Sequence, residues 1–538
     1  MRFPPLALVG LSSLIAAPAA PAQAPRPGAR PPASEAQVPS RPAPAETPAL
    51  PKADPSQVGT STETKPVVDL THRYRFVERY TARDEEAGPG QVGAYHVAIQ
   101  EVLRDTIEGP DGAGKSVETG RRTLYAERPS EVSGVGAATA TIRRYESYEV
   151  RPDEPARPGR PRPLDGLTIW YRPQVNEPPL ILSLAPDRRL REREYEVAAR
   201  QVFVPSLTAL LPIYPVRVGD SWRVPHRAVQ AMLGEPDLKG DQLVGRFAEL
   251  RREADGRTTQ AVLAIAGRIA NPFADTMVNA QVLFAFATPE ADAAADPGSP
   301  RPRDESLIEA RGSILELRLT RESRGVLPGA TPAARPQKYR ASQEMVLERK
   351  PGLGPATGPL PRPSTPPAPS ESNTWLTHDD PRDRFAFQHP QDLLPSDRLQ
   401  LGLKAGSGAI YLAKTRPEGR DLVRFEFSAK DQAPEALKDL LTAQWKQAQA
   451  EVLPGDEGWL PAADWPSGVK VYRVEAALQV ANRGPRTPRV HYDAYLVKLG
   501  PDASLIVVAT TTRDAVLAFR RDVEAMIRTV RLGASGGG

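Results

Sequence analysis

The sequence predicts two folded modules, an N-terminal antiparallel β-rich module and a C-terminal α+β module. In the first, apolar and polar residues alternate with a two-residue period over long runs that short polar segments connect. In the second, this period gives way twice to that of an amphipathic helix. Between them, Pro351 to Ser370 is rich in proline and glycine and has no apolar periodicity. We therefore expect a linker there.

The rest of the chain is divided on the same grounds. We expect a signal peptide at residues 1–22, a disordered Pro/Ala-rich tether at 23–66 and the β-rich module at 67–350. The linker then covers 351–372, the α+β module 373–533 and a flexible tail 534–538. A fully extended linker of this composition reaches about 60 Å over twenty residues. We therefore predict that a protease cut in the linker releases two independently folded pieces.

The N-terminus has the features of an export signal. Arg2 is followed by an apolar run from Leu6 to Ala17 and then by small residues. We place cleavage after Ala22, because cleavage after Ala24 would leave Pro25 at the scissile bond. An uncleaved anchor is the alternative, but the run is shorter than the ~20 residues that span a bilayer. The expected location is therefore extracytoplasmic, periplasmic or secreted, with no membrane span after cleavage.

Composition excludes several classes of function. The chain has no cysteine, so disulfides, thiolate metal sites and cysteine nucleophiles are ruled out. Its 70 basic residues nearly balance 66 acidic ones, for a net charge of +4 over 538 residues. Nucleic-acid binders instead concentrate Lys and Arg on one face. We expect no nucleic-acid partner.

Strand-like alternation begins after Val67 in the first module. In Arg73 to Tyr80, the aromatic residues share one side of a strand and the arginines the other. Further strands are expected at 91–105, 117–125, 137–150, 167–171, 242–250, 259–269, 277–286, 315–319 and 339–347. Two proline-rich insertions, Arg151 to Pro163 and Pro289 to Pro302, are interpreted as surface loops. Helix is expected only near Ser206 to Leu211 and Arg227 to Leu233, so the module is predicted to be a curled meander or half-barrel.

The second module has a different order of elements. Strands are expected at 385–390, 409–413, 422–427, 468–480, 489–499 and 505–510, with a short one at 529–532. Helices are expected at Ala436 to Ala450 and Asp514 to Arg528, with Leu437, Trp445 and Phe519 in the core. Arg520 and Arg521 are assigned to solvated faces.

This order resembles that of the PsbP and Mog1-like α/β/α sandwich family. The shared features are the opening Phe385 to Pro390, a central helix, and an ending in which Leu505 to Thr510 precedes a helix and a short Thr-Val-Arg strand. The resemblance covers about Thr377 to Leu532. It implies a binding or accessory module without naming a ligand. The first module loosely resembles uncharacterised exported β-rich bacterial proteins with a Val-Gly-Asp-Ser-Trp segment, and no functional residue is carried over from them.

Gly219-Asp220-Ser221 is the strongest enzymatic candidate. It resembles the Gly-Asp-Ser block of an esterase family in which serine is the nucleophile and a downstream Asp-x-x-His completes the site. Here the only nearby Asp-x-x-His, Asp69 to His72, lies upstream. His226 follows Ser221 by five residues, and its imidazole could act as the base only if the fold brings it to the Ser221 hydroxyl. We interpret the segment as a turn before a buried Trp222.

Metal and phosphate motifs are incomplete. The six histidines are His72, His96, His226, His378, His389 and His491, and no two are four residues apart on a helix. His378-Asp379-Asp380, with Asp383, lacks the glycine and closing glutamate of a calcium loop. We expect no metal there, and a surface hydrogen bond between His491 and Asp493.

Gly109 to Ser116, which includes Lys115, formally matches Gly-x4-Gly-Lys-Ser. The residues from Val117 onward predict a strand where a phosphate loop needs a helix, so a hairpin tip is expected there.

These observations favour an exported, non-catalytic binding or scaffold protein of the bacterial cell envelope. No catalytic, cofactor or metal residue is assigned, and no cofactor is expected. The partner is expected to be an unknown protein or an apolar small molecule. Two alternatives stay open: a carrier of an apolar ligand in a half-barrel cavity, and a serine hydrolase that uses Ser221.

Overall fold

A computed structural model describes most of the chain between residues 65 and 533. Its longest internal gaps are 83–90, 152–162, 288–305, 328–336, 353–359, 396–408 and 481–489. The expected signal peptide, nearly all of the tether and the C-terminal tail lie outside the described residues.

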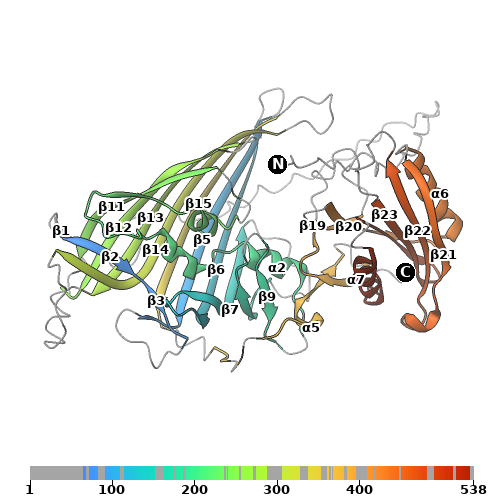
Figure 1. Ribbon diagram of the computed structural model, residues 1–538, viewed down its shortest axis with the longest axis horizontal. Coiled ribbons are helices and arrows are strands. Elements are labelled where there is room, and N and C mark those ends of the chain that lie inside the picture. The colour runs from blue at the N-terminus through green and yellow to red at the C-terminus, as the bar shows by residue number, and fades with distance from the viewer. Residues whose placement is uncertain are drawn as a thin grey trace, which may run out of the picture.

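One large open sheet forms most of the N-terminal part (Figure 1). Its neighbouring strands run in the order β1, β11, β12, β13, β14, β15, β5, β6, β7, β8, β9. Their bounds are β1 Lys65–Val67, β11 Asp241–Arg252, β12 Thr258–Ala270, β13 Ala274–Ala287, β14 Leu307–Leu327, β15 Gln337–Pro351, β5 Tyr95–Glu108, β6 Gly114–Val132, β7 Ala138–Arg151, β8 Thr168–Arg172 and β9 Leu180–Ser183. All of these pairings are antiparallel, which confirms the predicted antiparallel β-rich fold, although β1 pairs with β11 and β15 with β5, so the strands do not form one continuous meander.

Four short strands complete the described strands of this part. β2 (Arg73–Val77) runs parallel to β14, and β10 (Ser221–Arg223) pairs with β11. β3 (Arg79–Tyr80) and β4 (Gln91–Val92) form a separate parallel pair.

The two-residue period of the sequence produces the two faces of this sheet. In β13, Val278, Val282 and Phe284 are fully buried, whereas the alternate residue Met277 is about half exposed. The buried side chains belong to one apolar cluster that also contains residues of the helical segments. We call this side of the sheet the inner face. Its packing is the main contribution to stability in this part of the chain.

Three helical segments pack on the inner face: α2 (Glu192–Ala199), the 3-10 helix η3 (Val204–Leu210) and α3 (His226–Leu233). The last two lie within a few residues of the predicted helices at 206–211 and 227–233, whereas α2 was not predicted. The segment Glu-Arg-Glu-Tyr-Glu-Val-Ala-Ala contains three glutamates, and its buried positions include Glu194, which accepts hydrogen bonds from Arg188 and from the Arg191 N–H. A carboxylate in a buried position conceals the apolar stripe on which helix prediction depends.

The C-terminal part contains a seven-stranded sheet in the order β18, β19, β20, β24, β23, β22, β21. Its bounds are β18 Leu394–Pro395, β19 Ile410–Arg416, β20 Gly419–Ser428, β24 Ala503–Thr512, β23 Val490–Gly500, β22 Lys470–Val480 and β21 Ala450–Trp459. Helix α7 (Val516–Arg528) packs with Tyr495 and Val507, whereas α6 (Pro434–Gln447) packs with Ala494 and Val508. The two helices therefore cover opposite faces, because adjacent strand residues point to opposite sides.

The other C-terminal elements are short. β16 (Trp375–Asp379), β17 (Phe385–Pro390) and β25 (Arg531–Leu532) form a three-stranded sheet, with α5 (Glu371–Thr374) before it and the 3-10 helix η4 (Ala462–Asp464) after β21. β16 and β21 were not predicted. Leu437 and Phe519 are buried and Trp445 packs against the core, as expected.

Arg520 corrects one prediction about this part. It was assigned to a solvated face, but its guanidinium lies 2.9 Å from an Asp493 oxygen and 2.8 Å from a Glu475 oxygen. Asp493 therefore pairs with an arginine of α7. A helical surface position and a position facing two acidic strand residues have the same local pattern, which is why the sequence did not distinguish them.

The N-terminal and C-terminal parts touch through α2, β9 and the segment around β16. Figure 1 shows α2 and β9 at the end of the large sheet next to α5. Leu376 of β16 is only 1% exposed and belongs to the apolar cluster of the N-terminal part. The Thr377 N–H donates to the Leu190 carbonyl at 2.8 Å, and the Ile181 N–H to the Gln391 side chain at 3.4 Å. Because one core receives a residue from beyond the linker, the chain does not divide cleanly at residue 351.

Candidate functional site

A cavity of about 570 Å³ lies between the inner face of the large sheet and helices α2 and α3. This volume falls within the range of small-molecule sites in proteins. The sheet contributes residues of β14, β15, β5, β6 and β7, the five strands that pair in the middle of its order. Another pocket lies beneath α6 next to Trp445 and measures about 20 Å³, enough for one water molecule.

The strand register arranges the sheet wall of the cavity in levels. Ile99 pairs with Thr123, and Thr123 with Tyr148, so these three side chains form one level. All three are nearly buried. Two residues further along β5, Glu101 pairs with Arg121. The cavity wall thus passes from a largely apolar level to a charged one along β5.

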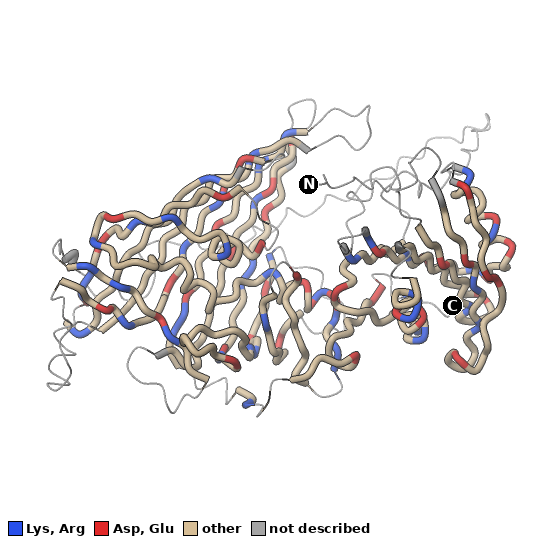
Figure 2. The backbone as a smooth tube through the Cα atoms, in the orientation of Figure 1, with Lys and Arg blue, Asp and Glu red and all other residues tan. Residues whose placement is uncertain are grey.

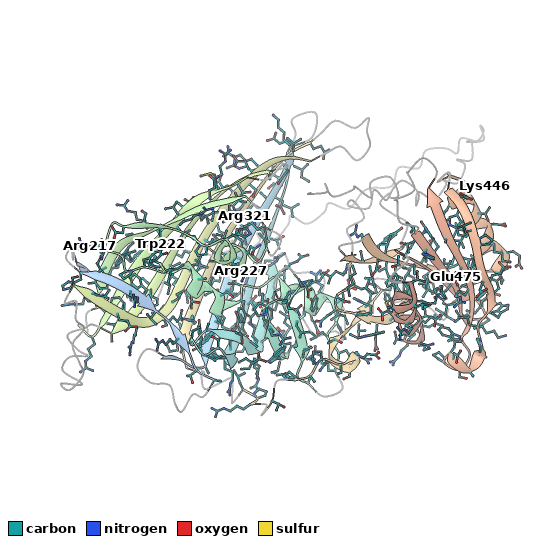
Figure 3. All side chains as sticks on the ribbon, in the orientation of Figure 1. Arg217, Trp222, Arg227, Arg321, Lys446 and Glu475 are labelled. Atoms are coloured by element: carbon teal, nitrogen blue, oxygen red, sulfur yellow. The ribbon has the colours of Figure 1, made fainter. Side chains whose placement is uncertain are left out.

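The charged level is internally hydrogen bonded. Glu101 accepts from Arg121 Nη1 at 3.2 Å and, through its other oxygen, from Gln343 Nε2 at 2.6 Å. Arg321 of β14 donates to Glu235, the second residue after α3. Figure 3 shows Arg321 over the large sheet. Two carboxylates of the lining are therefore already neutralised by arginines.

Helix α2 presents Arg193, Glu196, Val197 and, at its C-cap, Arg200 to the cavity, the positions of one helical face. Burial, followed by repulsion from Glu192, raises the pKa of Glu196, although Arg200 and Arg193 oppose the rise. With four arginines and three glutamates, the lining is on balance positive.

Two N–H donors of the lining have no acceptor within the described part of the chain. They are Arg321 Nε and Gln201 Nε2, both shielded from solvent. Gln201 uses its side-chain oxygen to accept from the Tyr145 hydroxyl at 2.8 Å, which leaves its amide nitrogen available. Since buried donors normally find acceptors, these groups mark a place where a bound molecule would be stabilised.

The C-terminal ends of α2 and α3 pack closely against each other at the cavity. Gly234 caps α3 with φ +66°, and a Cβ built there would lie 2.8 Å from the Arg200 carbonyl oxygen. The next residue, Glu235, is the partner of Arg321. Gly234 therefore links Arg200, Gln201 and Arg321 into one neighbourhood. No sequence motif marks it, because its members come from separate elements.

The predicted turn at Ser221 is present. Gly219 has φ +97°, and the Asp220 carboxylate accepts from the Arg217 N–H at 2.8 Å. Ser221 is exposed on β10, while the His226 ring contacts Asp241. No hydrogen bond joins Ser221 and His226 in the described structure. Trp222 is only partly buried, although its indole N–H donates to the Leu210 carbonyl at 3.2 Å.

The described side chains of the cluster after residue 377 each contact a different partner. Asp380 pairs with Arg384 at 2.7 Å, Asp379 lies 3.7 Å from Arg191, and His378 contacts Glu192. Asp383 lies outside the described residues. Among those described, no three His, Cys, Asp or Glu side chains are grouped to hold a metal ion.

The phosphate-loop candidate joins two strands. β5 ends at Glu108 and pairs with β6 from Gly114 onward, and residues 109–113 lie outside the described structure. A strand follows the glycines where a phosphate loop needs a helix. This confirms the predicted hairpin.

A buried ion pair in the N-terminal core is a second cluster with unusual electrostatics. Arg143 Nε lies 2.7 Å from a Glu127 oxygen, and both side chains are 0% exposed. The guanidinium stacks 4.4 Å from the centre of the Tyr171 ring. Burial raises the pKa of Glu127 despite Arg143, and raises that of Tyr171 to about 12. Neither charged residue lines a described cavity, so we assign the pair to the core.

The large sheet carries no concentration of charge of one sign. Figure 2 shows basic and acidic residues interspersed along both parts of the chain. Within the described residues, no helix combines the length and the apolar character needed to cross a membrane.

Comparison with known proteins shows weak structural resemblances. No protein-family model and no curated protein matches the chain. Cyanobacterial PsbP (CyanoP) from Synechocystis sp. PCC 6803 is 12% identical, with a TM-score of 0.23, over 32% of this chain and 98% of that one. The immunity protein TplEi of Pseudomonas aeruginosa is 10% identical, with a TM-score of 0.17, over 51% and 95%. A BenF-like porin from Pseudomonas fluorescens Pf-5 is 8% identical, with a TM-score of 0.10, over 78% and 98%.

Resemblances at these scores support no argument about function. The cavity is therefore assessed on its own residues.

Proposed function

We propose that this chain is an exported, non-catalytic binding protein of the cell envelope that holds a small molecule between its large sheet and helices α2 and α3. The observation that carries the proposal is the 570 Å³ cavity, lined by both apolar and hydrogen-bonding side chains. Export is proposed from the N-terminal signal-like sequence alone. The PsbP and Mog1-like character of the C-terminal part is proposed from its order of elements.

A purely apolar ligand suits this cavity poorly. Its lining contains seven charged residues. Covering charged groups with hydrocarbon costs free energy that no new hydrogen bond would offset. The half-barrel alternative is therefore retained with a ligand that also has a polar group.

Adjacent positions on β6 allow a controlled test of the site. Thr119 lines the cavity, whereas Glu118 is exposed and pairs with Arg104 at 2.7 Å. We expect Thr119→Trp to fill the cavity and Glu118→Trp to leave it open, because adjacent strand residues face opposite sides. Small molecules released from the purified proteins by denaturation would be compared by mass spectrometry. The proposal predicts a compound with the wild type and Glu118→Trp that is depleted in Thr119→Trp; equal recovery from all three would contradict it.

Activity on esters would test the non-catalytic part of the proposal. Ser221 is the one hydrolytic nucleophile that the sequence singled out. We expect the wild type and Ser221→Ala to be indistinguishable on a panel of ester substrates. Turnover that disappears in Ser221→Ala would establish the hydrolase alternative instead.

A further inference from the structure

We infer that the ligand of this cavity is an amphiphile with an aliphatic chain and an anionic, acceptor-only end group, a carboxylate or a phosphate. The inference rests on the proposed function and specifies its ligand. It depends on how apolar and donor groups are distributed over the cavity wall.

The aliphatic chain has an apolar region to occupy. Ile99, Val202, Met232 and Met345 all line the cavity and are each less than 10% exposed. They come from β5, the segment after α2, α3 and β15, so the apolar surface surrounds the space from the sheet and from the helices. Burying a hydrocarbon chain against it gains about 0.8 kcal/mol for each methylene group.

The polar end of the ligand must accept hydrogen bonds. In the described lining, the buried polar atoms without a partner are Arg321 Nε and Gln201 Nε2, and both are donors. The Glu101 oxygens are each engaged, by Arg121 and Gln343. A carboxylate or phosphate brings acceptors for both of these donors.

The charge of the lining favours the same end group. Arg321 and Arg200 belong to the neighbourhood joined by Gly234, and Gln201 follows Arg200 directly. Guanidinium groups bind carboxylates and phosphates through charge-assisted hydrogen bonds, which are stronger in a partly desolvated site.

A set of probes with a common chain tests the end group. Binding of dodecanoate, dodecyl phosphate, dodecanol and dodecyltrimethylammonium to the full chain would be measured by calorimetry below their micelle concentrations. We expect at least one anion to bind about tenfold or more tightly than the alcohol, because a charge-assisted hydrogen bond contributes that much. The ratio between the two anions then identifies the end group. Equal or tighter binding of the alcohol or the cation would overturn the inference.

Substitutions at two arginines of β14 test where the anionic group of the ligand binds. Arg321→Gln should weaken anion binding about tenfold and leave dodecanol unchanged, and Arg321→Lys should restore part of the loss by restoring the charge. Arg324→Gln is the matched control, because its side chain is 69% exposed on the opposite face of β14. Anion affinity that is unaffected by Arg321→Gln would refute the placement.

Failure of the inference and failure of the proposed function are distinguishable. If dodecanol binds best and Thr119→Trp abolishes its binding, the cavity is a ligand site for another class of molecule. If no probe binds and Thr119→Trp releases the same compounds as the wild type, the cavity is not a ligand site.

Discussion

Glu192 of α2 accepts a hydrogen bond from the His378 ring of β16, across the contact between the N-terminal and C-terminal parts. The same carboxylate oxygen lies 3.5 Å from His389 Nε2, a ring that is fully buried. α2 also lines the cavity four residues further on, through Glu196. One short helix thus joins the cavity to the C-terminal part.

Glu192 should make stability depend on pH in the acid range. Burial raises the pKa of its carboxyl, but the hydrogen bonds from His378 and His389 outweigh burial and lower it to about 2. A pKa below the ordinary value of 4.5 means that the stabilisation is complete above about pH 5 and is lost as the pH falls toward 2. The expected loss is on the order of 3 kcal/mol. Urea unfolding between pH 2 and 6 would measure it.

The matched variants for this prediction are Glu192→Gln and Glu322→Gln. Glu322 is about half exposed and lies far from α2 in the sequence. Glu192→Gln should flatten the acid limb of the stability curve, whereas Glu322→Gln should leave it unchanged. If the wild type and Glu192→Gln lose stability in parallel below pH 5, other carboxylates are responsible.

The buried pair of Arg143 and Glu127 should be sensitive to loss of one member. Arg143→Met leaves Glu127 buried with no cation beside it, which we expect to cost about 3–5 kcal/mol of unfolding free energy. Arg143→Met with Glu127→Leu should recover much of the loss, because no charge is then left unpaired. Arg122→Met, at an exposed position of the neighbouring strand, is the control and should change stability by less than about 0.5 kcal/mol. Similar midpoints for Arg143→Met and Arg122→Met in urea would contradict this account.

Substitution of Gly234 tests how closely the C-terminal ends of α2 and α3 pack at the cavity. Gly234→Ala meets both the cost of φ +66° and a Cβ placed 2.8 Å from the Arg200 carbonyl oxygen. Gly256→Ala meets only a similar φ, +68°, with nothing within 4 Å. We expect about 1–2 kcal/mol for Gly256→Ala and a clearly larger loss for Gly234→Ala. Equal losses of unfolding free energy in chemical denaturation would contradict this, because they would show that the ends of α2 and α3 can move apart at no cost in free energy.

The sequence was a good guide to the fold wherever burial followed a regular period. β13 was predicted because Val278, Val282 and Phe284 alternate with exposed residues. α2 was missed because Glu194 holds a buried position through hydrogen bonds that a pattern does not reveal. β21 was missed because most of its described side chains, including Asp456 and Glu457, are exposed and give no apolar face.

The candidate site could not be predicted in the same way. Arg200 and Gln201 are neighbours at the end of α2, whereas Arg321 lies far away in the sequence on β14, and each has an ordinary local environment. The strand register and the Gly234 approach bring them together, and both are tertiary features. The motifs that did stand out, at Ser221 and Lys115, matched short patterns that lack the required surroundings.

The contact between the two parts changes the expected result of cutting the linker. Linker composition by itself predicts release of two separate pieces, whereas the burial of Leu376 in the N-terminal core predicts that the pieces remain bound. A protease site would be inserted between residues 353 and 359, and the cleaved protein would be analysed by size-exclusion chromatography. We expect the cut wild type to elute as one complex. Leu376→Asp should separate the pieces, because a buried carboxylate would face an apolar core. Leu532→Asp, at an exposed C-terminal position, is the control and should not separate them. Separate elution of the cut wild-type pieces would show that this contact is too weak to join the two parts.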